Sequence, residues 1–460
     1  MKGIFKKILM GLLSITMSMG ALSMVACNES GNNNTKFEDV GDEGIQYAVL
    51  VVSNTYYEKL DSYIRTMVEQ HDPIDPTSKR MYAFGVYGPM CITQSIEQMQ
   101  AEVNYVFKLA EKHNVPVYFQ MDDSTNYTTA FGDEATIDDK GTRFYQDPEM
   151  CEWVAFPEEG EEWGGQSYGM LPRWHCDWSG NAFATAGGFP CYNSEKYLTW
   201  YTKQVQEGFI KPLIENYSRL VKQGKGYLFA GISTGWETHI PNYTNSSMHS
   251  LRDFEKAQYG MHALYNMGYD AKKLKKEAAE KHVTVESLQT ELLYQVLADY
   301  IEYTCKLFYD AGIGRHKIFS HTVSISSSTG IQTTVHPPLW VSINDYCTPG
   351  WTMSPKTCPY NIDKVHATLA QYNRNEYANT EGYAHYDNVE NCRNYFKESL
   401  LGNARLVTAF CYDATTATSK YGYDKDRDFY YAQVIREWMN YQLGPDYTWA
   451  TRPTYSPYLT

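Results

Sequence analysis

Short apolar, β-rich runs recur along the chain and alternate with segments that have helical patterns. We predict eight strands, at 81–88, 115–121, 171–178, 227–232, 317–324, 339–346, 375–383 and 405–412. Helical segments separate most of them, and no Asn-Gly hairpin signal joins neighbours. Alternation of this kind indicates an α/β protein with a parallel sheet, and eight strands predict a (β/α)8 (TIM) barrel. The run at 45–53 is then an edge or lead-in strand.

The barrel accounts for most of the length. We assign residues 44–460 to one elaborated barrel domain with long βα loops, because such barrels extend beyond about 400 residues with insertions. The segment 127–169 is long, acidic and glycine-containing, so we expect an elaborated loop at the rim of a site. The segment 194–222 is predicted to be one long helix, kinked or broken at Pro212.

The first 27 residues have the pattern of an export signal. Residues 1–7 are basic, and an apolar run from 8 to 25 is too short and too interrupted to span a membrane. The end of this run, Met24-Val25-Ala26-Cys27, resembles the lipobox of bacterial lipoproteins. That resemblance implies lipidation of Cys27, residues 28–43 as a flexible tether, and an exported protein anchored to a bacterial membrane. The alternative is a soluble secreted protein in which Cys27 belongs to the apolar run.

Charge and composition exclude some partners and favour others. A formal charge of −14 and a pI near 5.4 argue against nucleic acid. Forty Tyr and ten Trp favour carbohydrate, because sugar rings stack on aromatic side chains. Nine cysteines besides Cys27 leave at least one thiol free, and the short-loop disulfide candidates are Cys347 with Cys358 and Cys176 with Cys191. No spacing indicates a zinc site, so we predict neither a metal nor another cofactor.

Two glutamates follow strand-like runs in a similar way. Glu237 comes after the run 227–232 within Gly235-Trp236-Glu237, and Glu381 directly precedes Gly382 and Tyr383. In a parallel barrel the active site is built at the carboxyl ends of the strands. Two carboxyl groups that converge there are what glycosidic bond cleavage requires, one as proton donor and one as nucleophile or base. Glu376 competes with Glu381 for the inward position.

By our count these acids follow the fourth and seventh strands. The arrangement resembles the large clan of retaining glycosidases with a (β/α)8 barrel, in which the acid/base follows strand four and the nucleophile strand seven. The resemblance implies that Glu237 is the acid/base and Glu381 the nucleophile. It is architectural and covers the chain from the first to the eighth strand. The clan usually has Asn before its acid/base, where this chain has Trp236. β-Amylase, an inverting barrel enzyme, has the same layout of glutamates and is the competing analogy.

Further residues at predicted strand ends are candidates for substrate binding. The densest group is Trp174, His175, Asp177 and Trp178, which bring aromatic and polar groups together. The other candidates are Tyr87, Asp122, Trp236, His239, His321, Asn344, Asp345, Trp351, Tyr383 and Asp413. Each has a structural alternative, since a Trp-rich patch can be the small core of a loop and an Asp can cap a helix.

The sequence therefore predicts a glycoside hydrolase acting on a poly- or oligosaccharide. Retention is expected rather than inversion. A second hypothesis is a lipoprotein on a degenerate barrel that binds carbohydrate without cutting it. An esterase or deacetylase ranks below both, because no metal-ligand pattern is present.

Overall fold

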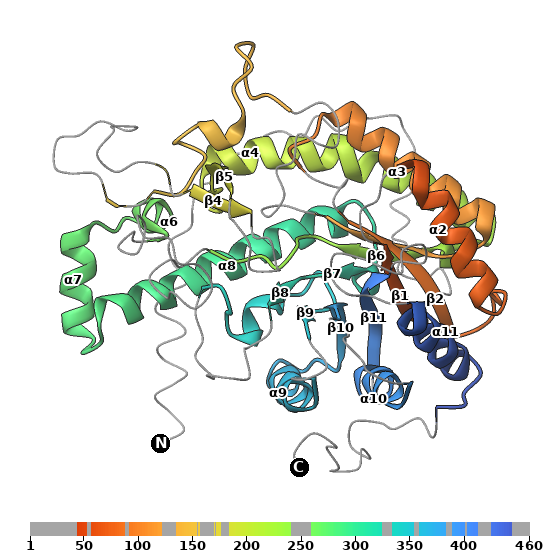
Figure 1. Ribbon diagram of the computed structural model, residues 1–460. Coiled ribbons are helices and arrows are strands. Elements are labelled where there is room, and N and C mark those ends of the chain that lie inside the picture. The colour runs from red at the N-terminus through yellow and green to blue at the C-terminus, as the bar shows by residue number, and fades with distance from the viewer. Residues whose placement is uncertain are drawn as a thin grey trace. The chain divides into compact units, whose positions relative to one another are not determined.

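Nine strand segments form one parallel sheet that closes on itself. In the computed structural model their order is β7-β6-β3-β2-β1-β11-β10-β9-β8. The two end members, β7 (Ile318–Phe319) and β8 (Thr322–Val323), are separated by only two residues. They form one continuous segment that pairs with β6 through its first half and with β9 through its second half. The sheet is therefore a barrel of eight strands, seen in part in Figure 1.

The bounds of the other barrel strands are β1 (Gln46–Val52), β2 (Arg80–Val86), β3 (Val117–Gln120), β6 (Phe229–Ser233), β9 (Gly350–Thr352), β10 (Glu376–Glu381) and β11 (Asn403–Tyr412). The structure describes residues 44–52, 57–87, 92–121, 135–153, 155–156, 170, 172–175, 184–240, 259–323, 334–353, 358–382, 389–400, 403–412 and 425–443. All of them belong to one compact unit, Lys36–Thr460.

The predicted fold class is confirmed, but three strand assignments were wrong, of which two concern the strand count. The run at 45–53 is the first barrel strand, β1, since it pairs with both β2 and β11. The run at 171–178 contains β4 (Pro172–His175), which pairs antiparallel with β5 (Ala184–Gly188) in a separate two-stranded sheet. The prediction left β1 out of the barrel and included β4, and these two errors cancel in the count. Glu237 therefore still follows the fourth strand, and Glu381 still ends the seventh.

The sixth strand also lies elsewhere. Residues Leu339–Ser342 form a 3-10 helix, and the strand is the three-residue β9 that begins at Gly350. An added side chain at position 350 would come within 2.4 Å of the Ser320 carbonyl oxygen, so the backbones approach too closely there for any residue but glycine. The run at 339–346 was predicted to be a strand because it is rich in apolar residues, and Leu339 and Val341 are buried although a 3-10 helix holds them.

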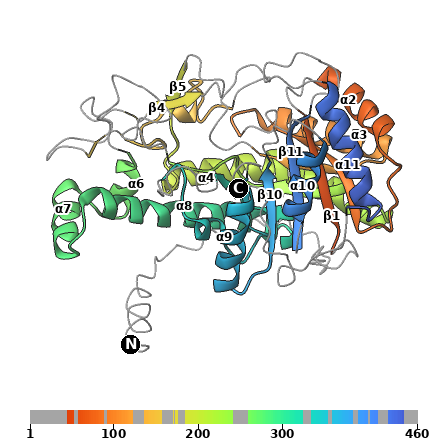
Figure 2. The same cartoon turned by 60° about the horizontal axis from the view of Figure 1, so that its bottom comes forward.

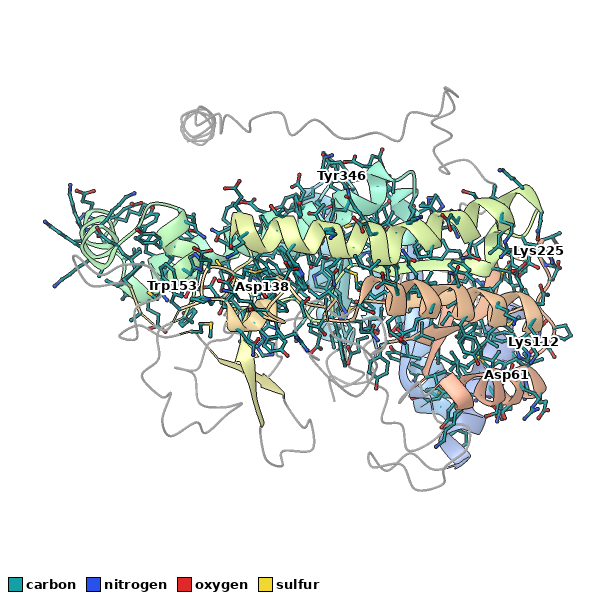
Figure 3. All side chains as sticks on the ribbon, turned by 90° about the horizontal axis from the view of Figure 1, so that it is seen from above. Asp61, Lys112, Asp138, Trp153, Lys225 and Tyr346 are labelled. Atoms are coloured by element: carbon teal, nitrogen blue, oxygen red, sulfur yellow. The ribbon has the colours of Figure 1, made fainter. Side chains whose placement is uncertain are left out.

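Helices follow most strands. Their bounds are α2 (Tyr57–Gln70), α3 (Ile96–His113), α4 (Glu195–Lys203), α5 (Lys211–Lys222), α6 (Met261–Asn266), α7 (Ala271–Glu280), α8 (Val285–Asp310), α9 (Cys358–Gln371), α10 (Val389–Leu400) and α11 (Lys425–Met439). The α3 helix begins where the Ser95 side chain accepts from the Gln98 N–H and ends at Asn114 in the left-handed conformation. Asp61 in α2 pairs with Lys112 in α3 at 2.7 Å (Figure 3).

The predicted helix at 194–222 is interrupted by a π-helical segment, Gln204–Ile210, between α4 and α5. Gly208 lies in this segment, where an added side chain would come within 2.3 Å of the Met99 side chain on α3. Pro212 does not break the chain, because it occupies the first turn of α5 and needs no N–H donor there.

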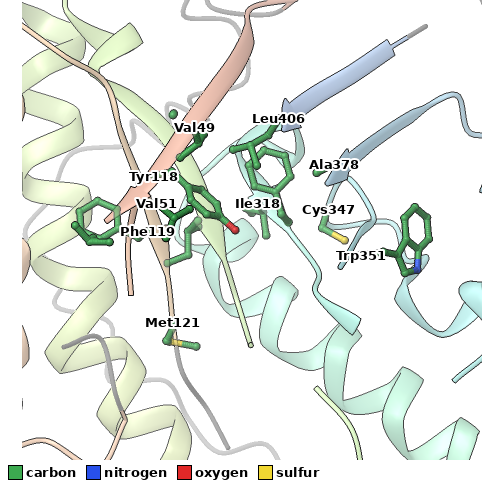
Figure 4. Packing of buried hydrophobic residues seen from close by; sticks show 14 of the residues in the cluster. Val49, Val51, Tyr118, Phe119, Met121, Ile318, Cys347, Trp351, Ala378 and Leu406 are labelled. Atoms are coloured by element: carbon green, nitrogen blue, oxygen red, sulfur yellow. The ribbon is translucent and has the colours of Figure 1, made fainter. Parts of the chain in front are cut away.

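The core is continuous from the barrel strands to the helices around them. Val49, Val51, Tyr118 and Leu406 are all buried at the strands (Figure 4). Helix α7 lies at the end of α8 farthest from the barrel strands (Figure 2). Among the residues described, no helix is long and apolar enough to cross a membrane. Cys191 and Cys347 carry free thiols, so neither of the two disulfide candidates forms.

Candidate active site

Glu237 is held in an unusual backbone conformation just beyond β6. Its φ of 49° lies in the left-handed region, which costs a residue other than glycine roughly 1–2 kcal/mol. Backbone hydrogen bonds on both sides hold it there, from the Thr234 N–H to the Phe319 carbonyl at 3.0 Å and from the Thr238 N–H to the His321 carbonyl at 2.9 Å. Strain of this kind, fixed by the surrounding fold, is typical of functional positions.

Glu381 is the last residue of β10, and an irregular register sets its direction. The side chain of Asn379 faces helix α10, where its amide donates to the Tyr395 hydroxyl at 2.8 Å. Residues two apart on a regular strand share a face. The pairing of β10 with β9 shifts between Asn379 and Glu381, and this lets Glu381 turn toward Glu237 instead. The competing Glu376 lies at the other end of the strand, where Arg405 binds it at 2.8 Å.

The two carboxyl groups meet in a small polar cluster. One oxygen of Glu237, one oxygen of Glu381 and one ring nitrogen of His321 lie within 4.8 Å of one another. Glu237 is 5% exposed and Glu381 7%. The Trp236 indole N–H donates to Glu381 Oε2, and the Gln120 amide nitrogen lies 3.4 Å from the same oxygen. The acids are thus next to each other, but hydrogen bonds from different residues hold them.

Glu237 also accepts a hydrogen bond from a neighbouring side chain, in this case from a hydroxyl group. Thr352, the last residue of β9, donates to Glu237 Oε1 at 2.7 Å. His321 Nε2 lies 2.8 Å from the same Thr352 oxygen, and the Gln120 amide nitrogen lies 3.3 Å from His321 Nδ1. Strand ends of β3, β9 and the β7/β8 segment therefore supply the groups around the acids.

Burial and mutual repulsion make ionisation of both acids difficult. Burial raises the pKa of Glu237 to about 7, and the Thr352 hydroxyl partly opposes this. Burial also raises the pKa of Glu381, the negative charge of Glu237 raises it further, and Trp236 and Gln120 oppose the rise. No lysine or arginine within the described segments pairs with either carboxylate. The two acids therefore titrate as a coupled pair, in which ionisation of one opposes ionisation of the other.

A metal ion is the other species that such a cluster could bind. We predicted none because neither His321 nor His239 has a ligand at suitable sequence spacing, but the fold brings His321 beside both acids. Both ring nitrogens of His321 already have hydrogen-bond partners in Gln120 and Thr352. A metal would have to displace one of them, so the cluster is better suited to carry a proton.

Four of the predicted binding residues lie at or beside the pair. Trp236 and His321 contact Glu381 as described, and Tyr87 packs edge-on against Trp236 with ring centroids 5.0 Å apart. His239 Nδ1 lies 2.6 Å from the Glu237 carbonyl oxygen. Tyr87 and His239 are half-buried, so part of each ring remains accessible.

Three predicted residues are not part of the site. Asn344 and Asp345 precede β9 and so lie at the amino end of the barrel, where Asp345 pairs with Arg374. They were predicted to lie at a strand end because the sixth strand was assigned to residues 339–346, which precede the true strand in the sequence. Trp351 is fully buried in the hydrophobic core (Figure 4), since neighbouring strand residues face opposite sides and it is Thr352 that faces the acids.

Other predictions are not tested by the described residues. For Trp174 and His175 only the backbone is described, in β4. Those that fall outside the described residues are Cys27, Asp122, Asp177, Trp178, Tyr383 and Asp413.

Sequence reasoning missed two residues, Gln120 and Thr352. Gln120 is a buried polar residue at the end of a correctly predicted strand, and this position was the available signal. We had singled out Asp122, two residues further on. Thr352 had no signal of its own, because β9 was not recognised as a strand.

No protein-family model matches the chain, and no curated relative matches it. Two solved structures are similar to it over most of its length. One is the catalytic domain of β-amylase from Paenibacillus polymyxa, with 7% identity, 86% of this chain and 99% of that chain covered, and a TM-score of 0.47. The other is a GH5_18 variant from Bifidobacterium longum in complex with Manβ1-4GlcNAc, with 9% identity, 86% and 78% covered, and a TM-score of 0.44. At these identities neither match assigns a role to a residue of this chain.

Proposed function

We propose that this protein is a retaining glycoside hydrolase that acts on a poly- or oligosaccharide, with Glu237 as acid/base and Glu381 as nucleophile. The observation that carries the proposal is the convergence of these two buried carboxyl groups at the ends of the fourth and seventh barrel strands. A glycosidase needs one carboxylic acid to protonate the leaving oxygen and one carboxylate to attack or stabilise the sugar carbon. A pair that shares one proton meets both needs.

Hydrogen bonds support the division of roles. Glu381 Oε2 faces two N–H groups, from Trp236 and Gln120, which can only donate and so favour an ionised carboxylate. Glu237 faces only one donor, the Thr352 hydroxyl. The charge of the pair is then better stabilised on Glu381 and the proton on Glu237, as a nucleophile and an acid require.

The separation of the two acids supports retention. Their closest oxygens lie within 4.8 Å, near the carboxyl spacing of about 5–5.5 Å in retaining enzymes. Inverting enzymes space their carboxyl groups about 6.5–9.5 Å apart to admit a water molecule. A direct attack by Glu381 on the sugar fits the shorter distance.

The substrate class rests on the aromatic and polar groups near the acids. Tyr87 and Trp236 form an aromatic corner next to the carboxyl pair, and His239 adds a polar ring. Apolar faces of a sugar ring stack on such a corner, while hydroxyl groups bond to the polar atoms.

Hydrolysis of a glycan panel tests the proposal. We expect wild-type protein to release reducing ends from at least one plant, host or microbial glycan, and proton NMR of the first product to show the anomer of the substrate. Release of the opposite anomer would indicate inversion, as in the β-amylase analogy. Glycan-array binding without any release would instead support a carbohydrate-binding protein on a degenerate barrel.

We further propose that the protein is exported and lipid-anchored through Cys27. The signal-like residues 1–27 carry this proposal. Expression in a bacterial host with a labelled fatty acid should label wild-type protein and leave Cys27→Ala unlabelled in the soluble fraction. Label retained by the variant would contradict the anchor.

A further inference from the structure

The residues between the two acids form one continuous hydrogen-bonded chain. It runs from Glu381 Oε2 to the Gln120 amide nitrogen, to the ring of His321, to the Thr352 hydroxyl and to Glu237 Oε1. The distances along it are 3.4, 3.3, 2.8 and 2.7 Å. Gln120 and His321 are almost completely buried, so water does not compete for these bonds.

The chemistry of each group fixes the direction of the bonds. An amide nitrogen only donates, so Gln120 donates to His321 Nδ1 and the single ring proton of a neutral His321 lies on Nε2. Nε2–H then donates to the Thr352 oxygen, and the Thr352 proton is left for Glu237 Oε1. Burial favours a neutral ring by lowering the pKa of His321 to about 3, against a smaller opposite effect of the Gly235 carbonyl.

This direction decides which oxygen of Glu237 can carry its proton. Oε1 accepts from Thr352, and the carbonyl oxygen of a carboxylic acid is a better acceptor than its hydroxyl oxygen, so this bond favours the proton on Oε2. We propose that Gln120, His321 and Thr352 are positioning residues that confine the acid proton of Glu237 to Oε2. The proposal rests on the function proposed above and adds how the acid is held ready.

The reaction follows with its atoms in balance. The Oε2–H proton passes to the leaving oxygen as the glycosidic C–O bond breaks and a C–O bond to Glu381 forms. Thr352 remains a donor throughout and stabilises the carboxylate that Glu237 becomes. In the second half a water molecule gives its proton to the same Oε2 and attacks the sugar carbon, while the C–O bond to Glu381 breaks and frees Glu381 as a carboxylate. The chain itself transfers no proton.

Several titratable groups face Glu237 within the described part of the fold. Glu381 comes from β10, His321 from the β7/β8 segment and His239 from the loop of Glu237 itself. Tyr118 on β3 lies near Glu381, and that carboxyl and burial both raise its pKa, so it stays neutral. Neither His321 nor Tyr118 therefore changes charge around neutral pH, and a shift in the alkaline limb of activity is not a shift of either of these groups.

Thr352→Val tests the positioning role, since it keeps the shape and removes the hydroxyl. Loss of a donor to the Glu237 carboxylate should raise the pKa of the acid, so the alkaline limb of kcat/KM should move up by about one pH unit. With an alkyl-type leaving group kcat should fall about 10–100-fold, and with a dinitrophenyl leaving group, which needs little acid help, less than about threefold. Thr352→Ser should restore both.

Thr322→Val is the matched control. Thr322 is a buried threonine on the adjoining strand, and its hydroxyl bonds to the Ser342 hydroxyl at 2.8 Å, away from the acids. We expect its pH profile and leaving-group dependence to match the wild type. An unshifted alkaline limb in Thr352→Val, with equal losses on both substrates, would overturn the proposal.

Nitrogen-15 NMR of His321 tests the chain without any activity measurement. The signal, assigned by its loss in His321→Gln, should show the proton on Nε2 in the wild type. A proton on Nδ1 would reverse the chain and overturn the proposal. If wild-type protein cleaves no glycan, the proposed function and the catalytic role of the chain both fail, and the NMR result still decides the hydrogen-bond direction.

Discussion

Among the described residues, buried glutamates lie in three regions, at Glu102, at Glu152 and at the pair Glu237 and Glu381, and only the pair has the features of an active site. Glu237 and Glu381 face each other at the carboxyl ends of two barrel strands. Glu102, in α3, is fully buried as well, and burial raises its pKa to about 9. Its Oε1 accepts from the Gln94 and Gln98 amides at 3.0 and 2.7 Å. Burial alone therefore does not distinguish a catalytic acid; a second acid within reach does.

The largest expected difference between the regions is in activity. Glu237→Gln and Glu381→Gln each remove one member of the pair, so hydrolysis of a substrate with a poor leaving group should fall by at least about 10²–10⁴-fold. Glu102→Gln replaces a neutral acid by a neutral amide and should retain wild-type kcat/KM. Rates are compared at pH 7 after circular dichroism shows that each variant is folded. A wild-type rate in either pair variant would remove that residue from the mechanism.

A smaller effect separates the donors to Glu381 from the surrounding core. Trp236→Phe loses the indole N–H bond to the carboxylate, worth about 1.5–3 kcal/mol, so kcat should fall about 10–100-fold with little change in stability. Trp351→Phe changes a fully buried ring with no contact to the acids, so it should lower Tm and leave kcat unchanged. Equal kcat losses in the two variants would show that the indole N–H has no special role.

The third difference concerns the pH dependence of stability at Glu102 and involves no change in activity. Its folded pKa of about 9 lies above the usual value of 4.5, so the folded state holds this proton more tightly than the unfolded state. The resulting stability is complete below about pH 4.5 and is lost as pH rises toward 9, by at most about 1.4 kcal/mol per pH unit. Glu102→Gln has no proton to lose at this position. Its free energy of unfolding in urea should therefore rise relative to that of the wild type between pH 5 and 9. If the difference in the free energy of unfolding between the variant and the wild type does not change with pH, Glu102 ionises normally.

The sequence predicted the barrel and both acids because these depend on local patterns. Burial makes barrel strands apolar, and a charged residue directly after such a run marks a strand end, as at Glu237 and Glu381. The seventh strand also shows the limit of prediction from local patterns, because sequence alone could not choose between Glu376 and Glu381. That choice depends on where β10 ends and on a register shift between β9 and β10.

The groups that hold the acids were harder to predict for a physical reason. Gln120 and Thr352 are ordinary polar residues, and their role arises only when barrel closure brings β3 and β9 to the same end. Trp351 was chosen by its position alone, yet its place in the strand turns its ring into the core. Strand β9 begins with a glycine, follows a proline and has only three residues. A strand of this length is too short to show a periodic pattern.

Chemical rescue by azide tests the roles of the two acids most directly. In Glu237→Ala, azide should attack the glycosyl-Glu381 intermediate and yield a glycosyl azide with the configuration of the substrate. In Glu381→Ala, azide should take the place of the missing carboxylate and yield the opposite configuration. Rescue with both configurations as stated would establish Glu237 as acid/base and Glu381 as nucleophile. The same configuration from both variants, or no glycosyl azide from either, would contradict the account.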